Sequence, residues 1–193
     1  MFGRFGLHLT EAECMLTTGM RIQEVTRFWF ARRPWQGPST EELALAILQG
    51  VIARIRERGV PMPGVYEVIR LFRSRGLRLA LASSSAEKLI DTVVDHLQIR
   101  DSLEAICSAE NEARGKPSPD VYLTAAAKLG VAPERCLAIE DSIAGVASAK
   151  AAGMKCIAVP LPELRADSRY QIADAAVDSL AQIDDPLLVR LGI

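Results

Sequence analysis

The chain has 193 residues, of which 49% are hydrophobic, and its 23 basic residues nearly balance its 24 acidic ones. This length is enough for one large domain, or for a core with a smaller appended domain. The charged residues are spread along the chain and leave a net charge of -1, which argues against a nucleic-acid partner. No apolar run approaches the roughly 20 residues of a membrane span.

Cysteine and histidine usage narrows the chemistry further. The four cysteines are scattered without metal-ligand spacing, and no export signal is evident at the start of the sequence. We therefore expect reduced cysteines and a cytoplasmic location. The two histidines, His8 and His96, lie far apart in sequence, which argues against a Ser/His/Asp or Cys/His triad.

The first third of the chain predicts helices only. Apolar residues recur at three- and four-residue spacing within 20–33 and within 40–58. Two prolines and a glycine break the chain between these segments, and Ser39 or Thr40 is suited to cap the second helix. We expect residues 1–62 to form a small helical domain.

From residue 63 onward, helical and strand patterns alternate. The expected helices cover residues 65–76, 86–97, 119–129 and 142–153. The expected strands cover residues 77–83, 104–109, 135–140, 155–160 and 174–180. Ser118 is the expected cap of the third helix, and Gly130 its end. This alternation predicts an α/β fold for residues 63–193, a Rossmann-like parallel sheet flanked by helices.

Polar residues follow three of the expected strands, where ligands bind in parallel sheets. Ser83 and Ser84 follow the first strand, Lys116 lies in a loop after the second, and Glu140 and Asp141 end the third. Singly, each has an ordinary explanation, such as a helix cap or a solvated lysine. Together they suit a phosphate and metal site, because hydroxyls, amides and lysine bind phosphoryl oxygens and paired carboxylates suit Mg²⁺.

Three stretches resemble motifs of a known family. "LALASSS", "GKPSPDVYLTAAAKLG" and "AIEDSIAGVASAKAAGM" are similar to the second, third and fourth motifs of the haloacid dehalogenase-like hydrolases. They most resemble the branch that contains beta-phosphoglucomutase and 2-deoxyglucose-6-phosphate phosphatase. "TTGMRIQEVTRFWFARRPWQG" resembles that branch's helical cap domain. The resemblance covers nearly the whole chain and implies a cap at 1–62 and an α/β core at 63–193.

The resemblance implies a Mg²⁺-dependent phosphatase of small phosphorylated metabolites, above all sugar phosphates, that works through an aspartyl phosphate. Ser83 and the amide of Ser84 would bind the phosphoryl group. Lys116 would hold that group together with the nucleophile's carboxylate. Glu140 and Asp141 would hold the metal ion.

Substrate choice depends on the cap. The resemblance places Arg21 where relatives bind the non-reacting groups of the substrate, and an exposed arginine at a helix start is the alternative. Residues 1–60 contain no lysine, so a phosphonate-cleaving relative, which needs one for a Schiff base, is excluded. A haloacid dehalogenase, which needs no metal, would leave the acidic pair unexplained. A phosphosugar mutase remains an alternative.

The sequence departs from the family at its first motif, DxDGxxxDS, which supplies the nucleophile and the acid/base aspartate. Nothing in the sequence matches it, and Asp91, Asp95 and Asp101 lie beyond the second motif. We expect Met1 to be an internal methionine of a longer protein, and no phosphatase turnover by this chain alone. The alternatives are a short protein that borrows a strand from a partner, and a non-catalytic module that binds phosphate or protein.

The family's first strand also has no counterpart in the sequence. In the family it lies between the strands that here end at Ser83 and Glu140. Without it, the sheet should either keep two unpaired edges or close up. A monomer is expected, with a strand-exchanged dimer as the alternative.

Overall fold

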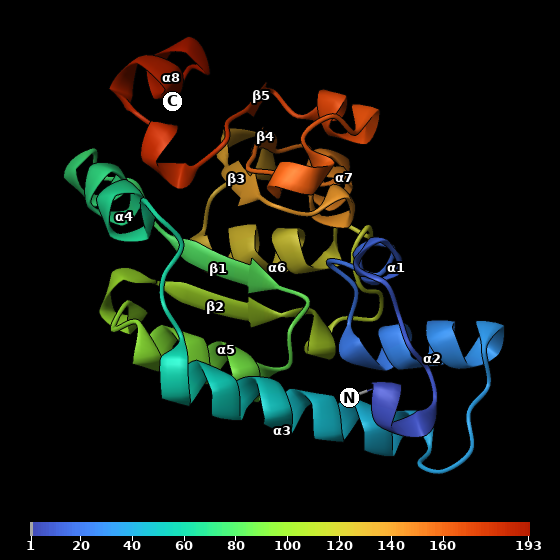
Figure 1. Ribbon diagram of the computed structural model, residues 1–193. Helices are drawn as coiled ribbons and strands as arrows, with labels where there is room; N and C mark the ends of the chain where they lie inside the picture. The colour runs from blue at the N-terminus through green and yellow to red at the C-terminus, as the bar shows by residue number, and fades with distance from the viewer. Residues whose placement is uncertain (1) are drawn as a thin grey trace.

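The computed structural model describes residues 2–193. It begins with a helical part that contains η1 (Phe2–Phe5), α1 (Glu11–Met15), α2 (Ile22–Arg32) and α3 (Thr40–Arg58). Both helices predicted for this part are therefore confirmed, and α3 runs along the edge of the α/β part, against α5 (Glu87–His96) (Figure 1).

Ser39, one of the two predicted capping residues, is the N-cap of α3. Its hydroxyl accepts the Glu42 N–H at 3.1 Å, and the Glu42 carboxylate accepts the Ser39 N–H at 2.8 Å. This reciprocal pair satisfies two donors that the helix start leaves free. A small apolar core of Leu7, Trp29, Trp35 and Leu43 then holds the helical part together.

The remainder of the chain is an α/β unit, as predicted. Its helices are α4 (Val65–Ser74), α5, α6 (Asp120–Leu129), α7 (Ile143–Ala151) and α8 (Asp185–Arg190). Its strands are β1 (Ala80–Ser83), β2 (Ala105–Ser108), β3 (Leu137–Glu140), β4 (Lys155–Ala158) and β5 (Ala175–Ala176). No helix within residues 2–193 is both long and apolar enough to cross a lipid bilayer.

The predicted cap of α6 was wrong, although the helix itself is confirmed. Pro119, not Ser118, occupies the cap position. Ser118 instead donates its hydroxyl to Asp120 Oδ1 at 2.7 Å, and its carbonyl accepts the Ser148 hydroxyl at 2.6 Å. These bonds tie the start of α6 to α7. Gly130 ends the helix as predicted, in the left-handed conformation with φ 62°.

The strands form two parallel sheets within the described residues, β1–β2 and β3–β4–β5. Ala80 pairs with Ala105 in the first sheet, and Leu137 pairs with Lys155 in the second. No hydrogen-bonded pairing joins β1 to β3 in this part of the chain. The sequence left two outcomes open, unpaired strand edges or a closed sheet. The structure shows the first, because the edges of β1 and β3 that face each other stay unpaired within residues 2–193.

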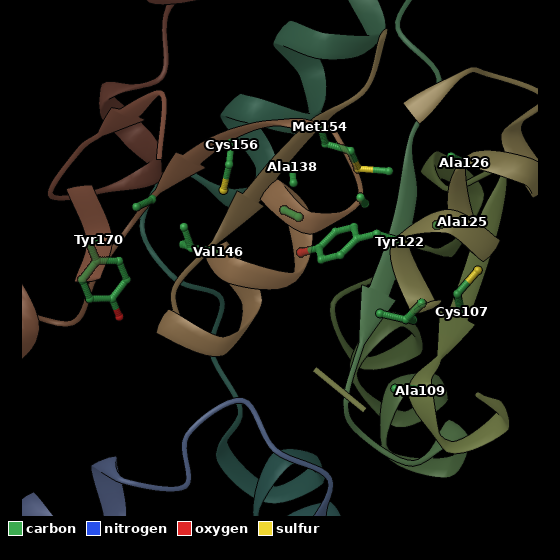
Figure 2. Close-up of a cluster of buried hydrophobic side chains, with 14 residues drawn as sticks. Cys107, Ala109, Tyr122, Ala125, Ala126, Ala138, Val146, Met154, Cys156 and Tyr170 are labelled. Carbon is green, nitrogen blue, oxygen red and sulfur yellow. The ribbon is translucent and has the colours of Figure 1, made fainter. Parts of the chain in front are cut away.

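A cavity of about 580 Å³ separates these edges and is lined from both sides, by residues 79–82 and 137–139. One apolar cluster, drawn in Figure 2, nevertheless spans the two sheets. It joins Cys107 of β2 and Ala125 of α6 to Ala138 of β3 and Val146 of α7. The packed helices, rather than strand pairing, hold the two sheets in place.

Candidate active site

A buried ion pair lies at the carboxyl ends of β1 and β3. The Lys116 ammonium donates to Glu140 Oε1 and, at 3.1 Å, to the carbonyl oxygen of Ala82. Both charged side chains are only 6% exposed. The alternative of a solvated loop lysine is therefore wrong. A buried charge is costly without its partner, so each of these side chains depends on the other.

Glu140 is surrounded by donors. Its Oε1 also accepts the Tyr122 hydroxyl, and its Oε2 accepts the Ser142 hydroxyl at 3.2 Å. Burial first, and then the negative charge of Glu140, raise the pKa of Tyr122 well above its usual value, so the phenol stays a donor. The Lys116 ammonium lies 4.8 Å from the centre of the Tyr122 ring.

The start of α7 shapes the space for this carboxylate. Ser142 caps the helix, since its hydroxyl accepts the Gly145 N–H at 3.0 Å. The Glu140 carboxylate lies directly against Gly145, where a Cβ would stand 2.0 Å from Oε2. Only glycine leaves room there. The positive end of α7 thereby lies beside the Glu140 carboxylate.

Asp141 differs from its neighbour because its side chain is exposed. Its carbonyl oxygen accepts the Tyr170 hydroxyl at 2.6 Å, which fixes the backbone at this position. Partial desolvation by the surrounding protein, followed by the negative charge of Glu140, raises the pKa of the Asp141 carboxyl. The acidic pair therefore divides into one enclosed carboxylate and one that faces solvent.

Of the two predicted serines, Ser83 is the last residue of β1 and Ser84 follows it directly. The Ser83 hydroxyl accepts the Ser85 N–H at 3.1 Å, which shapes the turn. The Ser84 hydroxyl is buried and has no partner within the described part of the chain. A buried hydroxyl without a partner costs about 1–3 kcal/mol. A phosphoryl oxygen is one acceptor that would satisfy it.

Arg21 connects the helical part to the site. Its guanidinium donates to Glu24 Oε1, with Nε at 2.9 Å, and to the carbonyl oxygens of Ala109 at 3.3 Å and Glu112 at 3.2 Å. These bonds dock α2 on the loop that leads to Lys116. Substrate binding by Arg21 stays a prediction, and it would require some of these bonds to be exchanged.

The chain offers a partial set of ligands for Mg²⁺. This ion takes six oxygen ligands and usually keeps several waters beside one or two carboxylates. Asp141 presents an open carboxylate, whereas Glu140 would have to release Lys116 or Ser142 to coordinate a metal. Residues 2–193 contain no cluster of three or more histidine, cysteine or acidic side chains that could hold a metal by themselves. The carboxylate ligands present fit a Mg²⁺ whose remaining coordination positions are filled by water and phosphate oxygens.

The sequence identified Ser83, Ser84, Lys116, Glu140 and Asp141, and the structure brings the last three together at one edge. The sequence also offered Ser142 as a helix cap, which the structure confirms. Sequence reasoning did not identify three other residues that shape the site: Tyr122, Gly145 and Tyr170. The only signal for Tyr122 was its place in the first turn of the helix after Lys116. The contact between Tyr170 and Asp141 has no local sequence signal, because 29 positions separate the two residues.

Comparisons with known proteins agree with this geometry. A protein-family model described as haloacid dehalogenase-like hydrolase matches residues 10–153. The chain is 41% identical over 167 residues to hexitol phosphatase B of Escherichia coli K12, which covers 86% of this chain and 75% of that protein. Its fold resembles that of a CbbY variant from Rhodobacter sphaeroides in complex with xylulose-(1,5)bisphosphate, with a TM-score of 0.84 and 27% identity over 94% of this chain and 84% of that one. It also resembles the fold of beta-phosphoglucomutase from Clostridium difficile, with a TM-score of 0.83 and 23% identity over 97% of this chain and 84% of that one.

Proposed function

Because the chain belongs to the haloacid dehalogenase-like hydrolase family, as its motifs predicted, we propose that it carries the phosphate- and metal-binding part of a Mg²⁺-dependent phosphatase of small phosphorylated sugars. A relative named hexitol phosphatase B and a similar structure that holds a sugar bisphosphate support this substrate class. The beta-phosphoglucomutase fold keeps the mutase alternative open, since it agrees with either reaction.

The observation that carries the proposal is the position of Lys116 between the ends of β1 and β3. Its ammonium uses two bonds to hold Ala82 and Glu140, and a third N–H is left for a phosphoryl oxygen. Ser83 and Ser84 lie at the end of β1 and supply hydroxyl and amide groups to the same ligand. Here Lys116 neutralises phosphoryl charge, and Glu140 fixes the ammonium in place.

We assign the metal site to Asp141 in the first place, because its carboxylate is the open one of the pair. Glu140 is the second predicted metal ligand. Its carboxylate would attract the ion by its negative charge alone, or would coordinate it after releasing the Ser142 hydroxyl. A bound Mg²⁺ would orient the phosphate and offset the repulsion between negative groups. Tyr122 and Tyr170 keep the two acidic residues in place from either side.

The aspartyl-phosphate step requires a nucleophile that the sequence does not contain, since no Asp-x-Asp pattern occurs in it. We therefore expect the isolated chain to bind Mg²⁺ and a phosphate ester without hydrolysing it. For the chain by itself, this is also the outcome expected of a non-catalytic binding module.

Calorimetric titration tests the proposal. Mg²⁺, and then a hexitol phosphate with Mg²⁺ present, should bind the purified chain. Asp141→Asn should weaken Mg²⁺ binding by about tenfold or more, and Lys116→Met should abolish binding of the ester. Asp178→Asn, which changes an acidic residue paired with Arg165 on the surface, is the matched control and should change neither.

Two results would contradict parts of this assignment. Absence of binding for both ligands would contradict the phosphatase site itself. Mg²⁺-dependent phosphate release by the pure chain would contradict the expected lack of a nucleophile. We also propose a cytoplasmic location, which the four free cysteines support. We further propose a monomer, and sedimentation velocity will measure the oligomeric state.

A further inference from the structure

The segment that leads into α2 lies against both sides of the candidate active site. On one side, a Cβ added to Gly19 would stand 2.6 Å from Ser142 Oγ, at the start of α7. On the other side, a Cβ added to Gly115 would stand 2.9 Å from Arg21 Nε and 3.0 Å from Glu24 Oε2. Arg21 and Glu24 therefore border the space into which the non-reacting part of a bound phosphate ester extends.

Arg21 and Glu24 form an ion pair at this border. Gly115, against which both side chains lie, directly precedes Lys116 in the chain. Arg21 Nε donates to Glu24 Oε1 at 2.9 Å, Nη2 donates to the same oxygen, and the Arg21 backbone N–H donates to Oε2 at 3.2 Å. The side chains are 22% and 29% exposed, so the pair is partly buried and salt screens it less than a surface pair. Its two charges cancel.

The donors of the Arg21 guanidinium are almost fully used. A guanidinium has five N–H groups. Nε and Nη2 each donate to Glu24, and Nη1 donates to the carbonyl oxygens of Ala109 at 3.3 Å and Glu112 at 3.2 Å. One N–H therefore remains, beside a carboxylate that still has an acceptor position. A hydroxyl group, which both donates and accepts, matches this combination.

A second phosphate group on the substrate would fit this border poorly. It carries about two negative charges at neutral pH and offers acceptors only. It would meet the carboxylate of Glu24, and it could use the full charge of Arg21 only by breaking the ion pair. Two neighbouring arginines are neutralised in the same way, since Arg27 pairs with Glu41 and Arg33 pairs with Glu13.

We propose that Glu24 is a specificity-determining residue, which restricts the site to phosphate monoesters whose remaining part is uncharged and carries hydroxyl groups. Glu24 holds the charge of Arg21, so it withholds the cation that a second phosphate would need and leaves one donor and one acceptor for a hydroxyl. This role rests on the proposed phosphatase function. It decides between the two kinds of substrate that the similar proteins suggest, a hexitol phosphate and a sugar bisphosphate.

Calorimetric titration with glucitol 6-phosphate and glucitol 1,6-bisphosphate, in the presence of Mg²⁺, tests this role, because the two ligands differ only in the second phosphate. The unchanged chain should bind the monophosphate at least about tenfold more tightly. Glu24→Gln keeps the shape of the side chain and removes its charge. It should raise the affinity for the bisphosphate, relative to that for the monophosphate, at least about tenfold. Glu41→Gln, which changes an exposed partner of Arg27, is the matched control and should leave this ratio unchanged.

A double variant identifies the source of the gain. When Arg21→Met is combined with Glu24→Gln, the freed guanidinium is absent, so the ratio should return to within about threefold of that of the unchanged chain. Circular dichroism checks that each variant folds. If the double variant does not fold, salt provides the comparison, because the gain of Glu24→Gln should decrease at least about threefold between about 0.05 M and about 0.5 M KCl.

The possible contrary results separate this role from the proposed function. If the unchanged chain binds neither ligand, the phosphatase site is wrong and the role of Glu24 falls with it. If it binds the bisphosphate as tightly as the monophosphate, or if Glu24→Gln leaves the ratio unchanged, the site stands and the role of Glu24 is refuted. A gain that persists in the double variant, or at high salt, would also refute it.

Discussion

Replacing Lys116 with methionine tests the central ion pair. The substitution keeps most of the side-chain volume, removes the ammonium, and leaves the Glu140 carboxylate with the Tyr122 and Ser142 hydroxyls alone. Both partners are 6% exposed, so the lost charge is not replaced by water. Removing one partner of such a pair destabilises a protein by about 3–5 kcal/mol.

This loss is large against a total stability of about 5–15 kcal/mol. In a chain of this length, each kcal/mol lowers the melting temperature by about 2–4 °C, so we expect a decrease of roughly 6–20 °C. Urea unfolding followed by circular dichroism at neutral pH will measure the free energy directly. Glu140→Gln and the double variant with Lys116→Met complete a double-mutant cycle.

The double variant should lose less stability than the sum of the two single variants, because a neutral amide needs no counter-charge. Arg70→Met is the matched control, since the Arg70–Glu67 pair is exposed and contributes less than about 1 kcal/mol. A loss for Lys116→Met no greater than that of the control would refute the reasoning.

Three further predictions concern other parts of the chain. Gly145→Ala should lower the free energy of unfolding by about 1–3 kcal/mol, measured by urea unfolding, because the new Cβ would displace the Glu140 carboxylate; an unchanged value would show that this carboxylate moves freely. Hydrogen bonds from Arg169 lower the pKa of Asp167 from 3.8 to about 2, so its contribution to stability is present above pH 3.8 and is lost as the pH falls toward 2; Asp167→Asn should remove this part of the pH dependence of unfolding. Burial, and then nearby Glu140, raise the pKa of Cys156 to about 12, so iodoacetamide at pH 8 should modify exposed Cys14 and spare Cys156, as mass spectrometry of peptides will show.

Much of the candidate site was accessible from the sequence because its residues lie at the end of a strand or in the segment after it. Parallel strands bring their carboxyl ends to one edge, so a serine, a lysine and an acidic pair after three strands predict a shared site. The capping role expected for Ser118 failed because Pro119 occupies the cap position and the Ser118 hydroxyl donates to Asp120 Oδ1. The sequence also could not predict the different environments of Glu140 and Asp141. The two residues are adjacent and both acidic, and no local pattern shows that the first is buried and the second exposed.

The sequence by itself determined the helices, the strands, their parallel order and the family, because these rest on periodicity, capping residues and motifs within short segments. Only the tertiary structure decided the partners of the charged groups. Lys116 meets Glu140 across 24 positions, and Arg21 meets Ala109 across 88. It also decided that β1 and β3 stay apart. That result depends on how α6 and α7 pack over both sheets, and no local pattern of residues records such packing.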